Sequence, residues 1–363
     1  MGYNFYACDR DQMLLMPASL EEWVGEGHLA RFLRTAVEAM DLKVLYEKYR
    51  EDGWGATAYD PRMMTEVLLY GYCMGVRSSR RIEKLCDEDV AFRYLAVNHR
   101  PDHVTLARFR RNHEKELEGL FTQVLRLCKE AGLLKVGLVS LDGTKIKATA
   151  ALSANRTLNE EAKANVTDPE SRIMKTRKGF IQGYNAQAVV TKEQIIVAAD
   201  VTQEENDQGQ LKPMMEEATR SLGALKMTRP IGVALADAGY DREENLKWAL
   251  GRKSKTDYFI ATQKDWKQRK AMRRKPGPRG RMPAGVSFKD RMTRKLLTRR
   301  GRRVYKLRSC TVEPEFGQMK GAQRFEGFSR KRLRAAQSEW KLAAAAHNLL
   351  KLWRNTNADR HGG

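Results

Sequence analysis

The chain has 363 residues, too many for one ordinary core, so we expect at least two domains. Of these residues, 42% are hydrophobic. Lysine and arginine number 67 against 45 aspartates and glutamates, and the formal net charge of +22 indicates a polyanionic partner, nucleic acid before a membrane surface. No apolar run reaches membrane-span length, the first residues are too charged for a secretory signal, and five scattered cysteines without a CxxC pair indicate neither zinc nor disulfides. We therefore expect a cytoplasmic protein associated with the nucleoid.

Residues 1–130 have the apolar spacing of successive helices. One helix opens at Asp60-Pro61, with proline in its first turn, and another is capped by Asp102 or Thr105. The second helix carries a group of arginines near its start that suits DNA binding: Arg108, Arg110 and Arg111. A helical bundle with solvated arginines fits these residues equally well. We assign the segment to a helical N-terminal DNA-binding domain.

A buried strand is predicted from Val136 to Asp142, because the apolar run is short and has no helical period. Gly143 follows and is expected to end the strand. A carboxylate at that position costs free energy unless a cation or a set of donors compensates it. Asp142 is therefore our first candidate metal ligand.

Further strands follow a polar segment, residues 153–178, which we interpret as a loop or an exposed helix. Residues 184–190 and 195–201 predict a hairpin with a short turn. Residues 230–237 predict a strand that ends in Asp237, and residues 257–262 predict another after an intervening helix. This alternation indicates a mixed α/β sheet.

Two aspartates at strand ends require a third ligand, and Glu313 and Glu315 are the candidates, on a helix expected to pack against the same sheet. Carboxylates that bridge two hard cations can drive an in-line displacement at phosphorus. Taken singly, Asp142 is explained as a turn residue and Asp237 as a helix cap, but their joint occurrence favours a catalytic role. Among the other acidic residues near element ends, Asp207 is the nearest rival.

The charged side chains of residues 264–308 are nearly all positive, and the only acidic residues among them are Asp265 and Asp290. We expect a basic insertion at about 264–304 that contacts the phosphate backbone, around a Pro/Gly-rich loop. The cluster before that loop is Arg273, Arg274 and Lys275. A helix from about 330 to 354 follows, and residues 356–363 are expected to be a disordered tail.

The order of motifs carries a family resemblance. SLDGTKIKA contains Asp142, ALADAGYD contains Asp237, and a Y-x2-R…E-x6-K pattern reads as Tyr305, Arg308, Glu313 and Lys320. Together they resemble the DDE transposases of bacterial insertion sequences. The family often has three residues between the arginine and the glutamate, where this chain has four. Glu313 is preferred to Glu315 because Lys320 then falls at the expected spacing.

The resemblance implies a mixed α/β fold with a ribonuclease-H-like catalytic core at residues 131–355, preceded by the helical domain. It implies cleavage and joining of transposon-end DNA by Mg²⁺-dependent transesterification, with Mn²⁺ as a possible substitute. Asp142, Asp237 and Glu313 would hold the metal, and Tyr305, Arg308 and Lys320 would hold phosphates. The implied partners are double-stranded DNA, as transposon ends and target, and further copies of the chain when DNA is bound.

Two other functions stay open. A metal-dependent nuclease without strand transfer needs the same three carboxylates, and an assay for joined products separates it from a transposase. A basic DNA-binding protein without catalysis, such as a decayed transposase, would have no use for three converging carboxylates.

Overall fold

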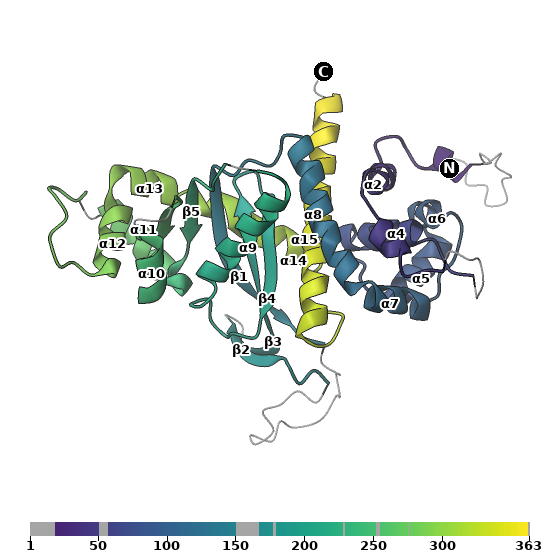
Figure 1. The fold of residues 1–363 in the computed structure, drawn as a ribbon, viewed down its shortest axis with the longest axis horizontal. Helices are drawn as coiled ribbons and strands as arrows, with labels where there is room; N and C mark the ends of the chain where they lie inside the picture. Colours follow the sequence, from purple (N-terminus) through teal and green to yellow (C-terminus); the bar gives the residue numbers. More distant parts are fainter. Residues whose placement is uncertain are drawn as a thin grey trace, which may run out of the picture.

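The computed structural model describes residues 19–50, 57–149, 167–176, 179–227, 229–251, 255–274 and 276–361. A helical part and a sheet part lie on either side of two long helices, α8 (Glu114–Glu130) and α15 (Leu333–His361) (Figure 1). The helices up to residue 130 are α1 (Leu20–Trp23), α2 (Leu29–Glu38), α3 (Lys43–Tyr46), α4 (Pro61–Cys73), α5 (Ser79–Glu88), α6 (Val90–Leu95), α7 (His103–Asn112) and α8 (Glu114–Glu130). The predicted helical N-terminal region is confirmed.

The predicted caps form as expected. Asp60 accepts a hydrogen bond from the Arg62 amide, and Pro61 occupies the first turn of α4. Asp102, rather than Thr105, caps α7 by accepting from the amides of Val104 and Thr105. Helix α4 is buried along nearly its whole length because α2 and the C-terminal helix α15 (Leu333–His361) both pack against it.

A six-stranded mixed sheet forms the second part. Its strands are β1 (Leu138–Lys147), β2 (Arg172–Thr176), β3 (Gly179–Thr191), β4 (Ile196–Thr202), β5 (Val233–Ala236) and β6 (Asp257–Ile260). The order is β2-β3-β1-β5-β6, and β4 pairs with the later part of β3. Strand β3 runs antiparallel to β1, β2 and β4, whereas β1, β5 and β6 are mutually parallel. The predicted hairpin and mixed sheet are confirmed.

Strand β2 lies in the segment that we interpreted as a loop or an exposed helix, so that prediction is wrong for its last part. Its residues are mostly polar and at the sheet edge, where the backbone pairing with β3 supplies the order that an apolar pattern would normally signal. Residues 150–166, 177 and 178 lie outside the described part of the chain.

Helices cover the sheet: α9 (Leu211–Ala224) packs on β4 and β3, and α14 (Arg308–Gly321) packs on β1 and β3. The β6 end is covered by α10 (Glu243–Ala249) and α12 (Phe288–Leu297), and a short 3₁₀ helix, η1 (Ala238–Tyr240), follows β5. The basic stretch is more ordered than predicted. It forms α11 (Asp265–Arg274), α12 and α13 (Arg299–Tyr305), and Met292 and Leu296 of α12 are fully buried.

Helix α15 continues to His361, which corrects the prediction of a disordered tail from residue 356. The Thr356 hydroxyl donates to the Leu352 carbonyl, and Asn357 Nδ2 donates to the Gly27 carbonyl at 3.1 Å, so the last turns are tied to the N-terminal helices. Residues 362 and 363 lie outside the described part. No helix in the described ranges combines the length and the apolar character needed to cross a membrane.

A buried ion network joins the two parts of the chain. The carboxylate of Glu339 on α15 lies 3.2 Å from an Arg77 nitrogen and 3.9 Å from an Arg110 nitrogen, and it accepts two further bonds from the Ser329 amide and hydroxyl at 2.9 and 2.8 Å. Arg110 also donates to the Tyr72 hydroxyl at 2.9 Å. Because Arg110 is only 5% exposed and engaged in this way, its guanidinium lies inside this structure and not at the surface, where the predicted contact with DNA would require it.

We expect Glu339→Ala to lower the free energy of unfolding by about 3–5 kcal/mol, because the change leaves two guanidinium groups with an uncompensated buried charge. Urea denaturation followed by circular dichroism measures the loss. The matched control is Glu244→Ala, which removes an exposed ion pair with Arg242 at 3.3 Å and should cost less than about 1 kcal/mol. Equal effects of the two changes would show that the Glu339 network adds no more than a surface pair.

Candidate active site

Asp142 and Asp237 lie side by side because β1 and β5 stop pairing at that point. The last parallel pair is Leu141 with Ala236, and each aspartate is the next residue. We predicted that the strand ends at Asp142, but β1 continues to Lys147 because β3 goes on pairing with it. Asp237 leaves the sheet, and its carboxylate accepts from the Gly239 amide at 2.8 Å, so it also caps η1.

Helix α14 brings Glu313 to the same edge. The Thr311 hydroxyl of α14 and the Ser140 hydroxyl of β1 form a hydrogen bond. This bond attaches the helix to β1 at a point two residues before Asp142. Pro314 has no amide to donate to the Cys310 carbonyl, and Gln194 donates there at 3.4 Å instead.

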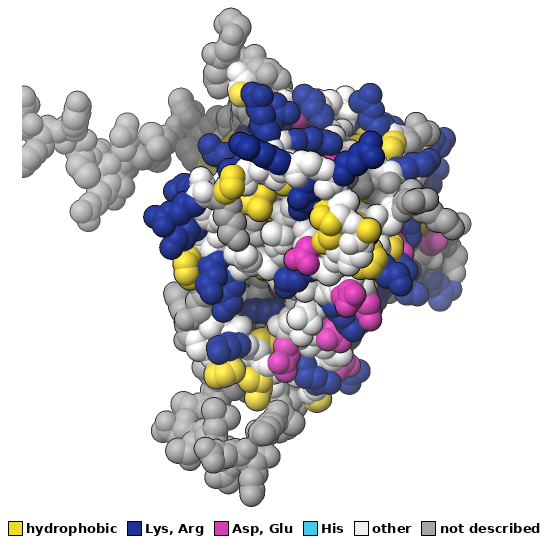
Figure 2. Space-filling view, turned by 90° about the vertical axis from the view of Figure 1, so that its left-hand side faces the viewer, with side chains coloured by type: hydrophobic (Ala, Val, Ile, Leu, Met, Phe, Trp, Pro, Cys, Tyr) yellow, Lys and Arg dark blue, Asp and Glu magenta, His cyan; other side chains and the backbone are white. Residues whose placement is uncertain are grey.

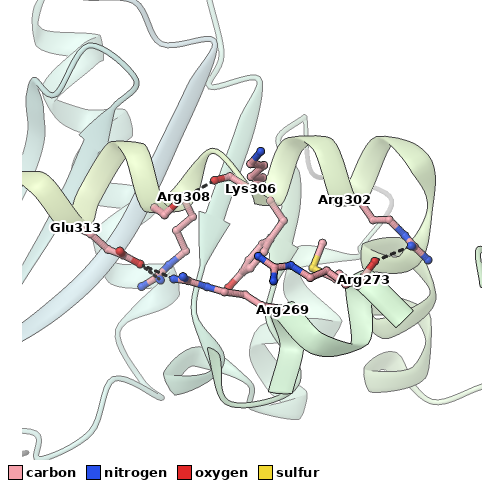
Figure 3. A pocket seen from close by; sticks show the side chains of 9 residues that line it. Arg269, Arg273, Arg302, Lys306, Arg308 and Glu313 are labelled. Atoms are coloured by element: carbon pink, nitrogen blue, oxygen red, sulfur yellow. Dashed lines mark hydrogen bonds and ion pairs between the residues drawn. The ribbon is translucent and has the colours of Figure 1, made fainter. Parts of the chain in front are cut away.

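The three predicted carboxylates converge on the guanidinium of Arg308. Its Nη2 atom lies 2.8 Å from Asp142 and 3.9 Å from Asp237, and its Nη1 atom lies 3.7 Å from Glu313. Glu313 also pairs with Arg269 of α11 at 3.1 Å (Figure 3). The Arg308 side chain is 6% exposed, whereas that of Glu313 is 43% exposed. A single buried guanidinium therefore faces carboxylates from a strand, a strand end and a helix.

Negative charge is concentrated at this edge. Burial raises the pKa of the Asp142 carboxyl to about 7; Arg308 opposes the rise, and the nearby charges of Asp237 and Asp207 add to it. The ionised form of Asp142 is thus held at the expense of free energy, and added positive charge would stabilise it.

Asp207 is closer to the site than the sequence indicated. Its Oδ1 atom accepts from Asn185 and Gln187, both at 2.7 Å, and lies 3.6 Å from Lys145 Nζ. A Cβ atom at Gly143 would lie 2.4 Å from that same oxygen. Gly143 therefore does not end a strand: it is a strand residue whose missing side chain makes room for Asp207.

The residues fit a divalent cation in chemistry, because carboxylate oxygens are the donors that Mg²⁺ prefers. Burial is the main cause of the raised pKa of Asp142, and the charges of Asp237 and Asp207 add to it, so a bound cation would favour the ionised form. In the described part of the chain, however, no three His, Cys, Asp or Glu side chains gather closely enough to hold a metal ion together. The guanidinium of Arg308 lies between them, so cation binding requires that side chain to move.

The predicted phosphate-binding residues fall into two groups. Tyr305 is only 5% exposed, and Lys320 is half-buried and donates to the Thr144 hydroxyl of β1. The other group is exposed at the surface and consists of Arg108 and Arg111 on α7 and Arg273 and Arg274 at the end of α11. Lys275 lies outside the described residues.

A basic pocket of about 380 Å³ opens beside the carboxylates (Figure 3). Its wall contains one acidic residue, Glu313, and five basic residues: Arg269, Arg273, Arg302, Lys306 and Arg308. Sequence reasoning did not single out Arg269, Arg302 or Lys306, although all three belong to the basic stretch. Lys and Arg side chains cover much of the surface at this α10–α13 end of the molecule (Figure 2). The pocket is suited to an anion.

Glu315, the alternative third ligand, lies in a different environment from the half-exposed Glu313. It is fully buried, and neither carboxylate oxygen has a hydrogen-bond partner among the described residues. Burial raises its pKa to about 8, against the opposing charge of Lys351. The geometry therefore favours Glu313 at the carboxylate cluster.

Comparison with known proteins gives two family matches. Residues 18–112 match a family described as a transposase domain, and residues 137–349 match the transposase DDE domain. No curated protein matches the chain. The second family match spans more than half of the sequence and includes Asp142, Asp237 and Glu313, and it agrees with the resemblance to the DDE transposases.

Two solved structures are similar to the chain at 8% identity. They are "Mos1 transposase paired-end complex with left transposon end", with a TM-score of 0.21, and "Crystal structure of a pre-cleavage Mos1 transpososome", with a TM-score of 0.22. The match to the first structure covers 77% of this chain and 82% of the Mos1 chain. The match to the second covers 92% of this chain and 97% of the Mos1 chain. Similarity at this level carries no argument about the site, which rests on its own geometry.

The two glutamates of α14 should differ in how their neutralisation changes the pH dependence of stability. The pKa of Glu315 is about 8 in the folded chain and near 4.5 when unfolded, so the folded state retains a proton that the unfolded state releases, and stability falls as pH rises from about 4.5 to 8. We expect Glu315→Gln to remove up to about 1.4 kcal/mol per pH unit of that decline. Urea denaturation across this pH range measures it. Glu313→Gln, at an exposed position, is the control and should leave the decline in place. If Glu315→Gln also left the decline in place, the Glu315 carboxyl would already be ionised in the folded protein.

Proposed function

The chain belongs to the family of DDE transposases, and on that premise we propose that Asp142, Asp237 and Glu313 hold the divalent cations with which it cuts and joins transposon-end DNA. The observation that carries the proposal is the convergence of these three side chains on Arg308, at 2.8, 3.9 and 3.7 Å. Three carboxylates from separate elements meet at one open sheet edge, where an uncompensated charge costs free energy. Transposases of this family use divalent metals in general, and the oxygen donors favour Mg²⁺, with Mn²⁺ as a substitute.

When bound, the cations would lower the pKa of the attacking water or 3′ hydroxyl and stabilise the leaving oxygen. The chain's own residues do the positioning. Asp142 is fixed by its pairing with Ala188 of β3 and by the β5 pairing of the residue before it, and Asp237 by its bond to the Gly239 amide. Glu313 is the most exposed of the three and sits beside the basic pocket, where the scissile strand would enter.

The basic side chains would hold the DNA. Those of the pocket face the phosphates next to the scissile bond, and arginine suits such contacts because it donates two parallel hydrogen bonds. Arg273 and Arg274 extend the basic surface along α11. We assign recognition of the element's ends to the N-terminal helices, with Arg108 and Arg111 of α7 as surface contacts. The partners are double-stranded DNA and a further copy of the chain, in the cytoplasm at the nucleoid.

Asp142→Asn should abolish strand cleavage while DNA binding survives, because the change removes a ligand charge and keeps the side chain's shape. The assay incubates purified protein with duplexes carrying candidate element ends and Mg²⁺, and resolves cleaved and joined strands on a denaturing gel. Glu216→Gln, an exposed neutralisation on α9, is the matched control and should cut at the normal rate. Normal cleavage by Asp142→Asn would remove Asp142 from the site, and cleaved but unjoined products from the wild type would indicate a nuclease.

Replacing Arg273 and Arg274 with alanine should weaken binding to all duplexes alike. Every phosphate that loses its arginine should flatten the plot of log affinity against log salt by about 0.9, so we expect a change of roughly one to two units. Fluorescence anisotropy across a salt series measures it. The control replaces Lys212 and Arg220, two basic residues of α9 that form ion pairs with acidic residues of the same helix. An unchanged slope in the α11 variant would place the DNA elsewhere.

A further inference from the structure

Arg308 occupies the position that a cation needs. Its guanidinium lies within hydrogen-bond distance of Asp142, at 2.8 Å, and within ion-pair distance of Asp237 and Glu313. A dication bound to the same oxygens would be a few ångströms from that guanidinium, and two positive charges at such a distance in a buried site repel each other by several kcal/mol. The cation and the inward position of Arg308 therefore exclude each other.

The same side chain also lines the basic pocket on the other side of Glu313. Figure 3 shows Arg308 and Arg269 reaching Glu313 from different helices, with Arg273, Arg302 and Lys306 along the rest of the wall. Arg302 is held by its bonds to the carbonyls of Leu297 and Met272, so part of this wall is fixed before any ligand enters. A phosphodiester in the pocket would offer Arg308 and Arg269 a new anionic partner.

We propose that a DNA phosphate bound in this pocket draws Arg308 away from Asp142 and thereby opens the carboxylate cluster to divalent cations. Arg308 is then a positioning residue that moves between two anionic partners, the protein's carboxylates without DNA and a phosphodiester with it. The proposal rests on the proposed function, since it takes Asp142, Asp237 and Glu313 as the cation ligands.

Thermodynamic coupling makes the idea measurable. If the cation binds only when Arg308 has turned outward, its apparent affinity in DNA-free protein is reduced by the fraction of molecules in that state. DNA that stabilises the outward state raises the cation affinity, and the cation must raise the DNA affinity by the same factor. Coupling of this kind typically amounts to about 5- to 150-fold.

The experiment measures Mn²⁺ binding by electron paramagnetic resonance, without DNA and with a saturating duplex of mixed sequence, and measures duplex binding by anisotropy with and without Mn²⁺. The proteins are wild type, Arg308→Gln, Arg269→Gln and Asp142→Asn, with circular dichroism as the check on folding. Mn²⁺ bound by the duplex itself is measured with the duplex alone and subtracted. None of these readouts depends on turnover.

For the wild type we expect each ligand to tighten the other by a common factor of about tenfold. Arg308→Gln should bind Mn²⁺ about tenfold more tightly without DNA and lose most of the coupling. Arg269→Gln, which removes an exposed partner of Glu313 and should fold normally, is expected to shift the DNA-free affinity in the same direction by a smaller factor.

Independent binding of Mn²⁺ and duplex to the wild type would overturn the inference, whether or not Arg308→Gln folds. So would unchanged DNA-free Mn²⁺ affinity in a folded Arg308→Gln protein. If Asp142→Asn binds Mn²⁺ as the wild type does under all conditions, the proposed metal site itself fails, and that outcome is distinct from the loss of coupling alone.

Discussion

The site depends on the unequal lengths of two neighbouring strands. β5 has four residues and stops at Ala236, whereas β1 has ten and continues past the same level. Among the described residues, the early end of β5 leaves a gap beside β1 that begins at Asp142 and closes at Lys147, which pairs with Gly327. This opening is where Asp237, Asp207 and Glu313 approach. If β5 extended further along β1, its backbone would fill the space in which the carboxylates meet. The sheet thus supplies both a rigid base for Asp142 and the room for its neighbours.

Much of this arrangement follows from local sequence. The apolar run before Asp142, the hairpin of β3 and β4 and the caps at Asp60 and Asp102 depend on residues close together in the chain, so their patterns predict them well. The central place of Arg308 was not predictable from spacing, because it depends on how α14 docks on β1. Arg110 shows the same limit. An arginine in the last turn of a helix is normally solvated, but this one is buried through contacts with Ser329 and Glu339, more than two hundred residues later.

Composition predicted a basic surface but not which basic side chains stabilise the fold and which face solvent. Within residues 264–308 the apolar residues are few, yet Met292 and Leu296 are enough to seat α12 against β6. The cations around them then serve different purposes. Lys295 pairs with Asp257 at 2.5 Å and donates to the Tyr258 carbonyl, whereas Arg273 and Arg274 face solvent. Net charge alone overstates the number of side chains that remain for a polyanion, because some are used to hold the fold together.

Helix α15 has a consequence for how the chain reaches this structure. The last helix of the described chain packs between early helices and the sheet, and Trp340 donates to the Gln187 carbonyl at 2.9 Å deep in the core. During synthesis, α4, α8 and β4 emerge long before the element that covers their apolar surfaces. These surfaces therefore stay open on the ribosome until α15 has been made, and cooperative folding waits for that helix. Contacts between residues so distant in sequence make folding slow, and the unfinished chain is a substrate for chaperones in that interval.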